Sequence, residues 1–112
     1  MSTHEIVLLA VLLNGDLAST SDDISIKIWN LENGSEKMSL KNHSDWVNAL
    51  AVLQNGDLAS ASKDKSIKIW NLEKGCIKMT FNNHSSSVLS LAVPQNGDLA
   101  SGSGDKTIKI WT

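Results

Sequence analysis

The sequence predicts an all-β chain that repeats one four-stranded antiparallel sheet three times, the last repeat lacking its outer strand. Two patterns recur every 41 positions without insertion or deletion, a tryptophan at Trp29, Trp70 and Trp111 and an Asn-Gly pair at Asn14, Asn55 and Asn96. Short apolar runs flank each Asn-Gly pair. A fixed period of this size predicts a repeat architecture, and the flanked Asn-Gly pair predicts a hairpin.

The second repeat shows how each element follows from its residues. Val47 to Leu53 is apolar on both faces, as expected of a strand that is covered on two sides. Asn55-Gly56 accepts the positive φ angles of a two-residue hairpin turn. The last segment alternates apolar and polar residues, which is the period of a half-buried edge strand. The predicted strands are residues 47–53, 58–62, 66–70 and 76–82, with a further turn at 63–65.

Several linked positions of this unit resemble the WD-repeat β-propellers, and the resemblance covers essentially the whole chain. The family opens its unit with Gly-His and closes its third strand with Trp-Asp. The matching pairs here are Asn42-His43, Asn83-His84, Trp29-Asn30, Trp70-Asn71 and Trp111-Thr112, so the Gly and the last Asp are replaced. The resemblance implies three propeller blades of antiparallel strands, at about residues 5–41, 46–82 and 87–112.

The resemblance also implies a buried structural network in each blade, in which hydrogen bonds run from Trp to Ser to His to Asp. Its members here are Ser19, Asp23 and Trp29, then His43, Ser60, Asp64 and Trp70, then His84, Ser101, Asp105 and Trp111. In the first repeat the position of the histidine is Ser2, and His4 lies two residues further on. We therefore expect a weaker network in the first blade.

A Ser/His/Asp set also suggests nucleophilic hydrolysis, but the pattern favours a structural role. An enzyme would need one exposed hydroxyl and an oxyanion hole, whereas this set is duplicated and has no nucleophile-elbow motif. Zinc is not expected, because the three histidines are far apart in the sequence and none has a second ligand at zinc spacing. The sequence thus predicts no enzymatic activity and no cofactor.

Composition agrees with a single small domain of 112 residues. The formal net charge of −2 offers no electrostatic basis for binding nucleic acid or an anionic membrane. The apolar run from Ile6 to Leu13 aligns with the inner strands of the other repeats, and no basic region precedes it as in a signal peptide. The lone Cys76 predicts a small buried side chain and favours a cytoplasmic setting.

Three blades are fewer than the four to eight of closed propellers. Such a wedge leaves one apolar sheet face open on each flank, and exposed faces of that kind drive association. We expect two chains to close a six-bladed ring, with three chains and nine blades as a further option. The alternative is that the sequence is a fragment of a longer propeller.

The resemblance implies a rigid scaffold that binds a protein or peptide. Trp46 is the only tryptophan outside the period, so it is either an exposed anchor or packed against a neighbouring loop. The partner-binding candidates are Trp46, Asn48, Lys63, Asp22 and Leu89. Two alternatives stay open: a lectin-like or small-ligand propeller, and a self-assembling or engineered repeat without a selected ligand.

Overall fold

Three antiparallel sheets make up the part of the chain that the computed structural model describes, residues 6–21, 23–94 and 96–111. The first sheet contains β1 (Ile6–Val11), β2 (Leu17–Ser21), β3 (Ile26–Trp29) and β4 (Glu36–Leu40). The second contains β5 (Val47–Val52), β6 (Leu58–Ser62), β7 (Ile67–Asn71) and β8 (Cys76–Phe81). The third contains β9 (Val88–Ala92), β10 (Leu99–Ser103) and β11 (Ile108–Trp111). The expected all-β fold, with sheets of four, four and three strands, is confirmed.

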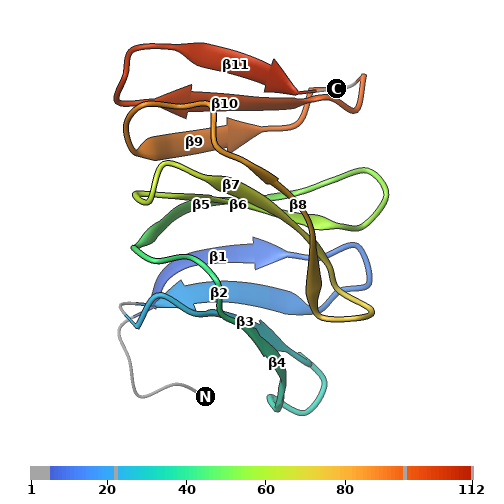
Figure 1. Ribbon diagram of the computed structural model, residues 1–112. Coiled ribbons are helices and arrows are strands. Elements are labelled where there is room, and N and C mark those ends of the chain that lie inside the picture. The colour runs from blue at the N-terminus through green and yellow to red at the C-terminus, as the bar shows by residue number, and fades with distance from the viewer. Residues whose placement is uncertain (1–5, 22, 95, 112) are drawn as a thin grey trace.

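The strands of each sheet are hydrogen-bonded in chain order, and the three sheets lie one above another in Figure 1. The inner strands β1, β5 and β9 are in contact across the sheets. The apolar run near the N-terminus forms β1. No helix that could span a bilayer occurs among the described residues.

Each Asn-Gly turn is stabilised by its own residues. Gly56 has a φ of 90°, which a residue with a Cβ rarely adopts. The Asp57 amide donates to Asn55 Oδ1 at 3.0 Å, an Asx turn that needs the short Asn side chain. The equivalent bonds in the other repeats join Asp16 to Asn14 and Asp98 to Asn96. These turns connect the first two strands of every sheet, as the sequence predicts. The expected two-residue turn is wrong, because Gly56 has a positive φ but Asn55 does not. The Leu53 amide donates to the Asp57 carbonyl, so three residues lie between the bonded pair.

Two apolar clusters fill the spaces between the sheets, and we call these spaces the first and second junctions. The first junction, between the first and second sheets, buries Leu12, Ala18, Ile26, Ile28, Leu40, Val47, Leu58 and Trp70. The second junction, between the second and third sheets, buries Ala59, Ala61, Ile67, Ile69, Val88 and Leu99. Phe81 and Trp111 stack across the second junction with ring centroids 4.4 Å apart. The core therefore lies between sheets, so each sheet depends on its neighbour for burial.

Cys76 is exposed, so the expectation of a buried cysteine is wrong. The residue begins β8, the outer strand, and pairs with Asn71 at the end of β7. An outer strand is hydrogen-bonded on one side only, and no neighbouring element covers its first residue. The alternation of apolar and polar residues does not indicate which end of this strand a neighbouring element covers.

Candidate functional site

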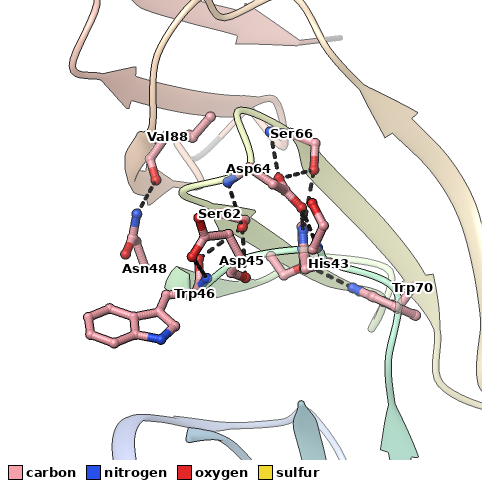
Figure 2. A network of polar contacts seen from close by, with 11 residues as sticks. His43, Asp45, Trp46, Asn48, Ser62, Asp64, Ser66, Trp70 and Val88 are labelled. Atoms are coloured by element: carbon pink, nitrogen blue, oxygen red, sulfur yellow. Dashed lines mark hydrogen bonds and ion pairs between the residues drawn. The ribbon is translucent and has the colours of Figure 1, made fainter. Parts of the chain in front are cut away.

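A chain of four hydrogen-bonded side chains crosses the second sheet (Figure 2). The indole Nε1 of Trp70 donates to Ser60 Oγ at 2.8 Å. Ser60 Oγ lies 2.6 Å from Nε2 of His43, whose Nδ1 lies 2.8 Å from Oδ2 of Asp64. The structure thus brings together the four residues that the resemblance assigns to this network.

The fold explains why these side chains meet. Ser60 on β6 pairs with Lys68 on β7, so Trp70 is its diagonal neighbour on the same face of the sheet. Asp64 lies in the turn between β6 and β7, and His43 lies in the loop that leads from β4 to β5. The network consequently joins two strands, one turn and the connection between two sheets.

The proton positions follow from the chemistry of each group. Burial favours the neutral form of Asp64, but hydrogen bonds from Ser66, His43 and the Ser44 amide outweigh it and hold its pKa at about 2. The carboxylate only accepts, so Nδ1 of His43 carries the proton. Burial lowers the pKa of His43, against the opposing effect of Asp64, so the neutral ring accepts at Nε2. Ser60 then donates to His43 and accepts from Trp70, which leaves all four groups paired.

The buried position of Ser60 bears on the catalytic interpretation. Its hydroxyl donates to His43 as a triad serine would, but its side chain is fully buried. A nucleophile must reach the substrate, whereas this hydroxyl contacts only the interior of the sheet. The geometry therefore favours the structural role, and the absence of enzymatic activity stays a prediction.

The third sheet repeats this arrangement. Trp111 Nε1 donates to Ser101 Oγ at 2.9 Å, and His84 bridges Ser101 at 2.8 Å and Asp105 at 3.1 Å. The Thr107 hydroxyl and the Ser85 amide also donate to Asp105 and hold the pKa of that carboxyl far below its usual value. Trp111 is only half-buried, so this copy of the network is less enclosed than the one in the second sheet.

The first sheet carries a different version. Trp29 Nε1 donates to Ser19 Oγ at 2.8 Å, while the carboxylate of Asp23 accepts from the hydroxyls of Ser21 and Ser25. No histidine joins Ser19 to Asp23 among the described residues, and Ser2 and His4 lie outside them. The weaker network expected for this repeat stays a prediction.

Two serines extend the network beyond the residues that the sequence singled out. Ser62 Oγ accepts from the Asp64 amide at 3.0 Å and donates to the carbonyl of Trp46 at 2.9 Å. Ser66 donates its hydroxyl to Oδ1 of Asp64 at 2.5 Å. A serine or threonine recurs at both positions every 41 residues, at Ser21, Ser62 and Ser103 and at Ser25, Ser66 and Thr107. That recurrence is the signal that would have identified them.

The partner-binding candidates occupy different surroundings. Trp46 is 56% exposed, and Figure 2 shows its ring pointing away from the network. Lys63 Nζ lies 5.9 Å from the centroid of that ring, so these two candidates are neighbours. Asn48 donates to the Val88 carbonyl at 3.0 Å and so bridges the second junction. Leu89 is exposed on β9, and Asp22 lies outside the described residues.

A groove of about 550 Å³ lies at the first junction, beside the Asn-Gly turns. Leu12, Ile28 and Met38 contribute its apolar lining. Two ion pairs also line it, Lys37–Asp16 and Lys78–Asp57, each with 2.7 Å between nitrogen and oxygen. These charged groups already have partners. The described residues include no group of three or more His, Cys, Asp or Glu placed to hold a metal ion.

Stacked antiparallel sheets of four, four and three strands, with their inner strands in contact, define the class as a segment of a β-propeller. The chain belongs to the WD-repeat family, since the model of the family described as "WD domain, G-beta repeat" matches residues 34–71 and 75–112. Each matched unit runs from an outer strand through three strands of the next sheet, so the repeat in sequence straddles two sheets.

Solved structures place the fold in the same class. The chain is similar to the crystal structure of the WD40 β-propeller domain of Doa1, with 28% sequence identity and a TM-score of 0.91. The similarity covers 100% of this chain and 38% of that one, so the chain spans well under half of its length. In all, 929 chains of solved structures match, which means that the fold alone does not select a ligand. A search of curated proteins found no match.

The pKa shifts predict a loss of stability in acid. The pKa of His43 is lowered on folding, so the unfolded chain takes up the proton first and stability falls as the pH drops below 6.5. The pKa of Asp64 is lowered from 3.8 to about 2, so its contribution is present above 3.8 and is lost between these values. Urea unfolding at a series of pH values would measure both effects.

A His43→Gln variant isolates the first of these effects. Glutamine does not titrate, so the dependence of its unfolding free energy on pH should be flatter than that of the wild type between about pH 7.5 and pH 5. Asp64 remains in the variant and should still destabilise it at lower pH. An equally steep profile in the variant would show that His43 does not titrate as described.

Proposed function

We propose that this chain is a non-catalytic scaffold that binds a protein or peptide on a surface centred on Trp46 and Lys63. The single observation that carries the proposal is an exposed tryptophan on a rigid support. Its carbonyl accepts from Ser62 Oγ at 2.9 Å and from the Lys63 amide at 2.9 Å. Ser62 in turn bonds the Asp64 amide, so the buried network fixes the backbone that presents the indole.

An anchor of this kind binds at low entropic cost. A tryptophan has two side-chain torsions and a large apolar area, and aromatic residues are enriched at interface hot spots. Because the backbone of Trp46 is already held, association orders only its side chain and that of Lys63.

The charge beside the indole indicates the kind of partner. The Lys63 ammonium lies next to the ring and forms none of the ion pairs found among the described residues. A peptide with an apolar side chain next to a carboxylate would contact both groups at once. We therefore propose an acidic, apolar segment as the ligand.

Peptide display on the immobilised protein would test this proposal. Selected sequences should combine an aromatic or aliphatic residue with an adjacent acidic residue, and Trp46→Ala should weaken their binding by at least about tenfold, the loss of roughly 1.4 kcal/mol. Leu31→Ala is the matched control, because Leu31 is an exposed apolar residue in the turn after β3. Selected peptides that bind Trp46→Ala as tightly as the wild type would refute the proposal.

The groove at the first junction supports the lectin-like or small-ligand alternative less well than Trp46 supports a scaffold. A sugar needs several free hydrogen-bonding groups in fixed positions, whereas the Asp and Lys side chains there are bonded to each other. The Asn14 and Asn55 side chains are likewise bonded within their turns. We therefore favour the scaffold.

We also propose that the scaffold self-associates head to tail, with two copies closing a ring of six sheets. Six lies within the usual range for propellers, whereas three copies would give nine. The exposed apolar residues of the first and third sheets support this proposal. The free thiol of Cys76 supports a cytoplasmic setting, where thiols are kept reduced.

A further inference from the structure

One face of the third sheet is open although its counterparts in the other sheets are buried. The three isoleucines that begin the third strands, Ile26, Ile67 and Ile108, are 0%, 0% and 78% exposed. The three that follow two residues later, Ile28, Ile69 and Ile110, are 2%, 7% and 57% exposed. The residue type is the same each time, and the third pair differs in having neither a neighbouring sheet nor a fourth strand beside β11 in the described structure.

The opposite face of the first sheet is open in the same way. Leu9 and Val11 on β1 are 62% and 65% exposed. Their counterparts on β5, Leu50 and Val52, pack into the first junction. The counterparts in the third sheet, Leu91 on β9 and Val93 just after it, pack into the second. The first sheet thus presents the half of a junction that the third sheet lacks.

The two internal junctions show which face of one sheet packs against which face of the next. In both, the Ile-x-Ile face of one sheet packs against the Leu-x-Val face of the next. We propose that the Ile108 and Ile110 face of one copy packs on the Leu9 and Val11 face of a second copy, as a third junction of the same kind. This inference rests on the proposed self-association and assigns its two surfaces.

The Asn-Gly turns give a separate indication of the same contact. A Cβ added at Gly56 would lie 3.7 Å from Leu13 of the preceding sheet, and one at Gly97 would lie 2.8 Å from Gln54. At Gly15 it would meet nothing within 4 Å. The turn of the first sheet therefore also lacks the neighbour that the other two turns have, on the side where the second copy would dock.

The proposed third junction between two copies would differ from the two internal junctions at one position. Asn48 and Leu89 occupy equivalent places one period apart, each beside an irregularity in the pairing of the inner strand. Asn48 reaches across the second junction to the Val88 carbonyl, so Leu89 is placed to reach the second copy. Leu89 would add apolar contact there instead of a hydrogen bond.

Two charged variants would test the surfaces by sedimentation at the highest soluble concentration. Ile110→Asp disables one face and Val11→Asp the other, and both side chains are exposed in a single copy, so the charge stays in water and folding is retained. Each variant alone should sediment as a 12.1 kDa monomer. Their equimolar mixture should form a species of twice that mass, because it restores one complete junction.

The controls separate this inference from the broader proposal. Trp46→Asp, at an exposed position just before β5 of the second sheet and so on neither open face, should keep the wild-type mass. If the wild type and Ile110→Asp both associate, the assigned surfaces are wrong but self-association itself stands. The same conclusion follows if the wild type associates and the mixture of the two variants stays monomeric. A monomeric wild type would overturn both, without bearing on peptide binding by Trp46. Circular dichroism would verify that each variant is folded. If either Asp variant unfolds, Ile108→Lys and Leu9→Lys would replace the two variants in the same experiment.

Discussion

Replacing Trp70 with alanine is expected to lower the free energy of unfolding by about 3 to 5 kcal/mol, the usual cost of truncating a buried aromatic residue. Trp70 is buried in the first junction, where it packs with Leu12, Ile28 and Leu58. The substitution would leave a cavity between two sheets and remove the indole donor of Ser60. Since small domains are stable by only about 5 to 15 kcal/mol, a loss of this size would bring the chain close to unfolding.

Urea denaturation followed by circular dichroism measures this loss as a shift of the midpoint at unchanged slope. Trp46→Ala is the matched control, because the same substitution at an exposed site should change stability by no more than about 0.5 kcal/mol. If Trp70→Ala and Trp46→Ala had similar midpoints, the burial and network role of Trp70 would be disproved.

Ser60→Ala should cost about 2 to 6 kcal/mol, although it removes a single oxygen atom. Two buried groups would lose their partner, the Trp70 indole and Nε2 of His43, and each unpaired buried group costs about 1 to 3 kcal/mol. Ser19→Ala offers the matched comparison, because Trp29 is the one side chain bonded to Ser19 among the described residues. Its expected cost is about 1 to 3 kcal/mol.

The difference between the costs of Ser60→Ala and Ser19→Ala is a sharper test than either cost alone. Ser19 and Ser60 occupy equivalent positions on buried second strands, so the loss of the hydroxyl itself is common to both. The difference measures the histidine arm of the network. Equal costs for Ser19→Ala and Ser60→Ala in urea titrations would mean that His43 contributes nothing through Ser60.

The strands could be predicted because their signals are local. Asn55-Gly56 marks a turn by the short Asn side chain and the positive φ of Gly56, and the alternation of 76–82 marks an edge strand without reference to any other part of the chain. The repeat then transfers each local signal to the other two units. This is why the all-β class and the strand order needed no knowledge of how the sheets pack.

Features that depend on how the sheets pack are harder to predict from the sequence. The hydrogen bond of the Asn48 amide to the Val88 carbonyl crosses the second junction, so it exists only once two sheets are placed together, and the role of Asn48 in partner binding stays a prediction. The predicted burial of Cys76 is wrong for the same reason, because exposure of an outer strand depends on what lies beside it. Ser62, by contrast, recurs with the period and could have been found from the sequence.

The network itself was inferred from a resemblance, and its chemistry became clear only from the geometry. The order Trp70, Ser60, His43 and Asp64 follows from the family pattern, but the tautomer of His43 follows from the carboxylate beside Nδ1 and the hydroxyl beside Nε2. The same network supports the exposed Trp46 through Ser62, a link between buried structure and proposed function that no spacing in the sequence reveals.

Solution mass tests most directly the proposal that these sheets expose complementary faces that a second copy covers. Sedimentation equilibrium of the wild-type chain at micromolar concentration should give a particle of twice the 12.1 kDa mass of the chain. A compact particle of 12.1 kDa at that concentration would contradict it.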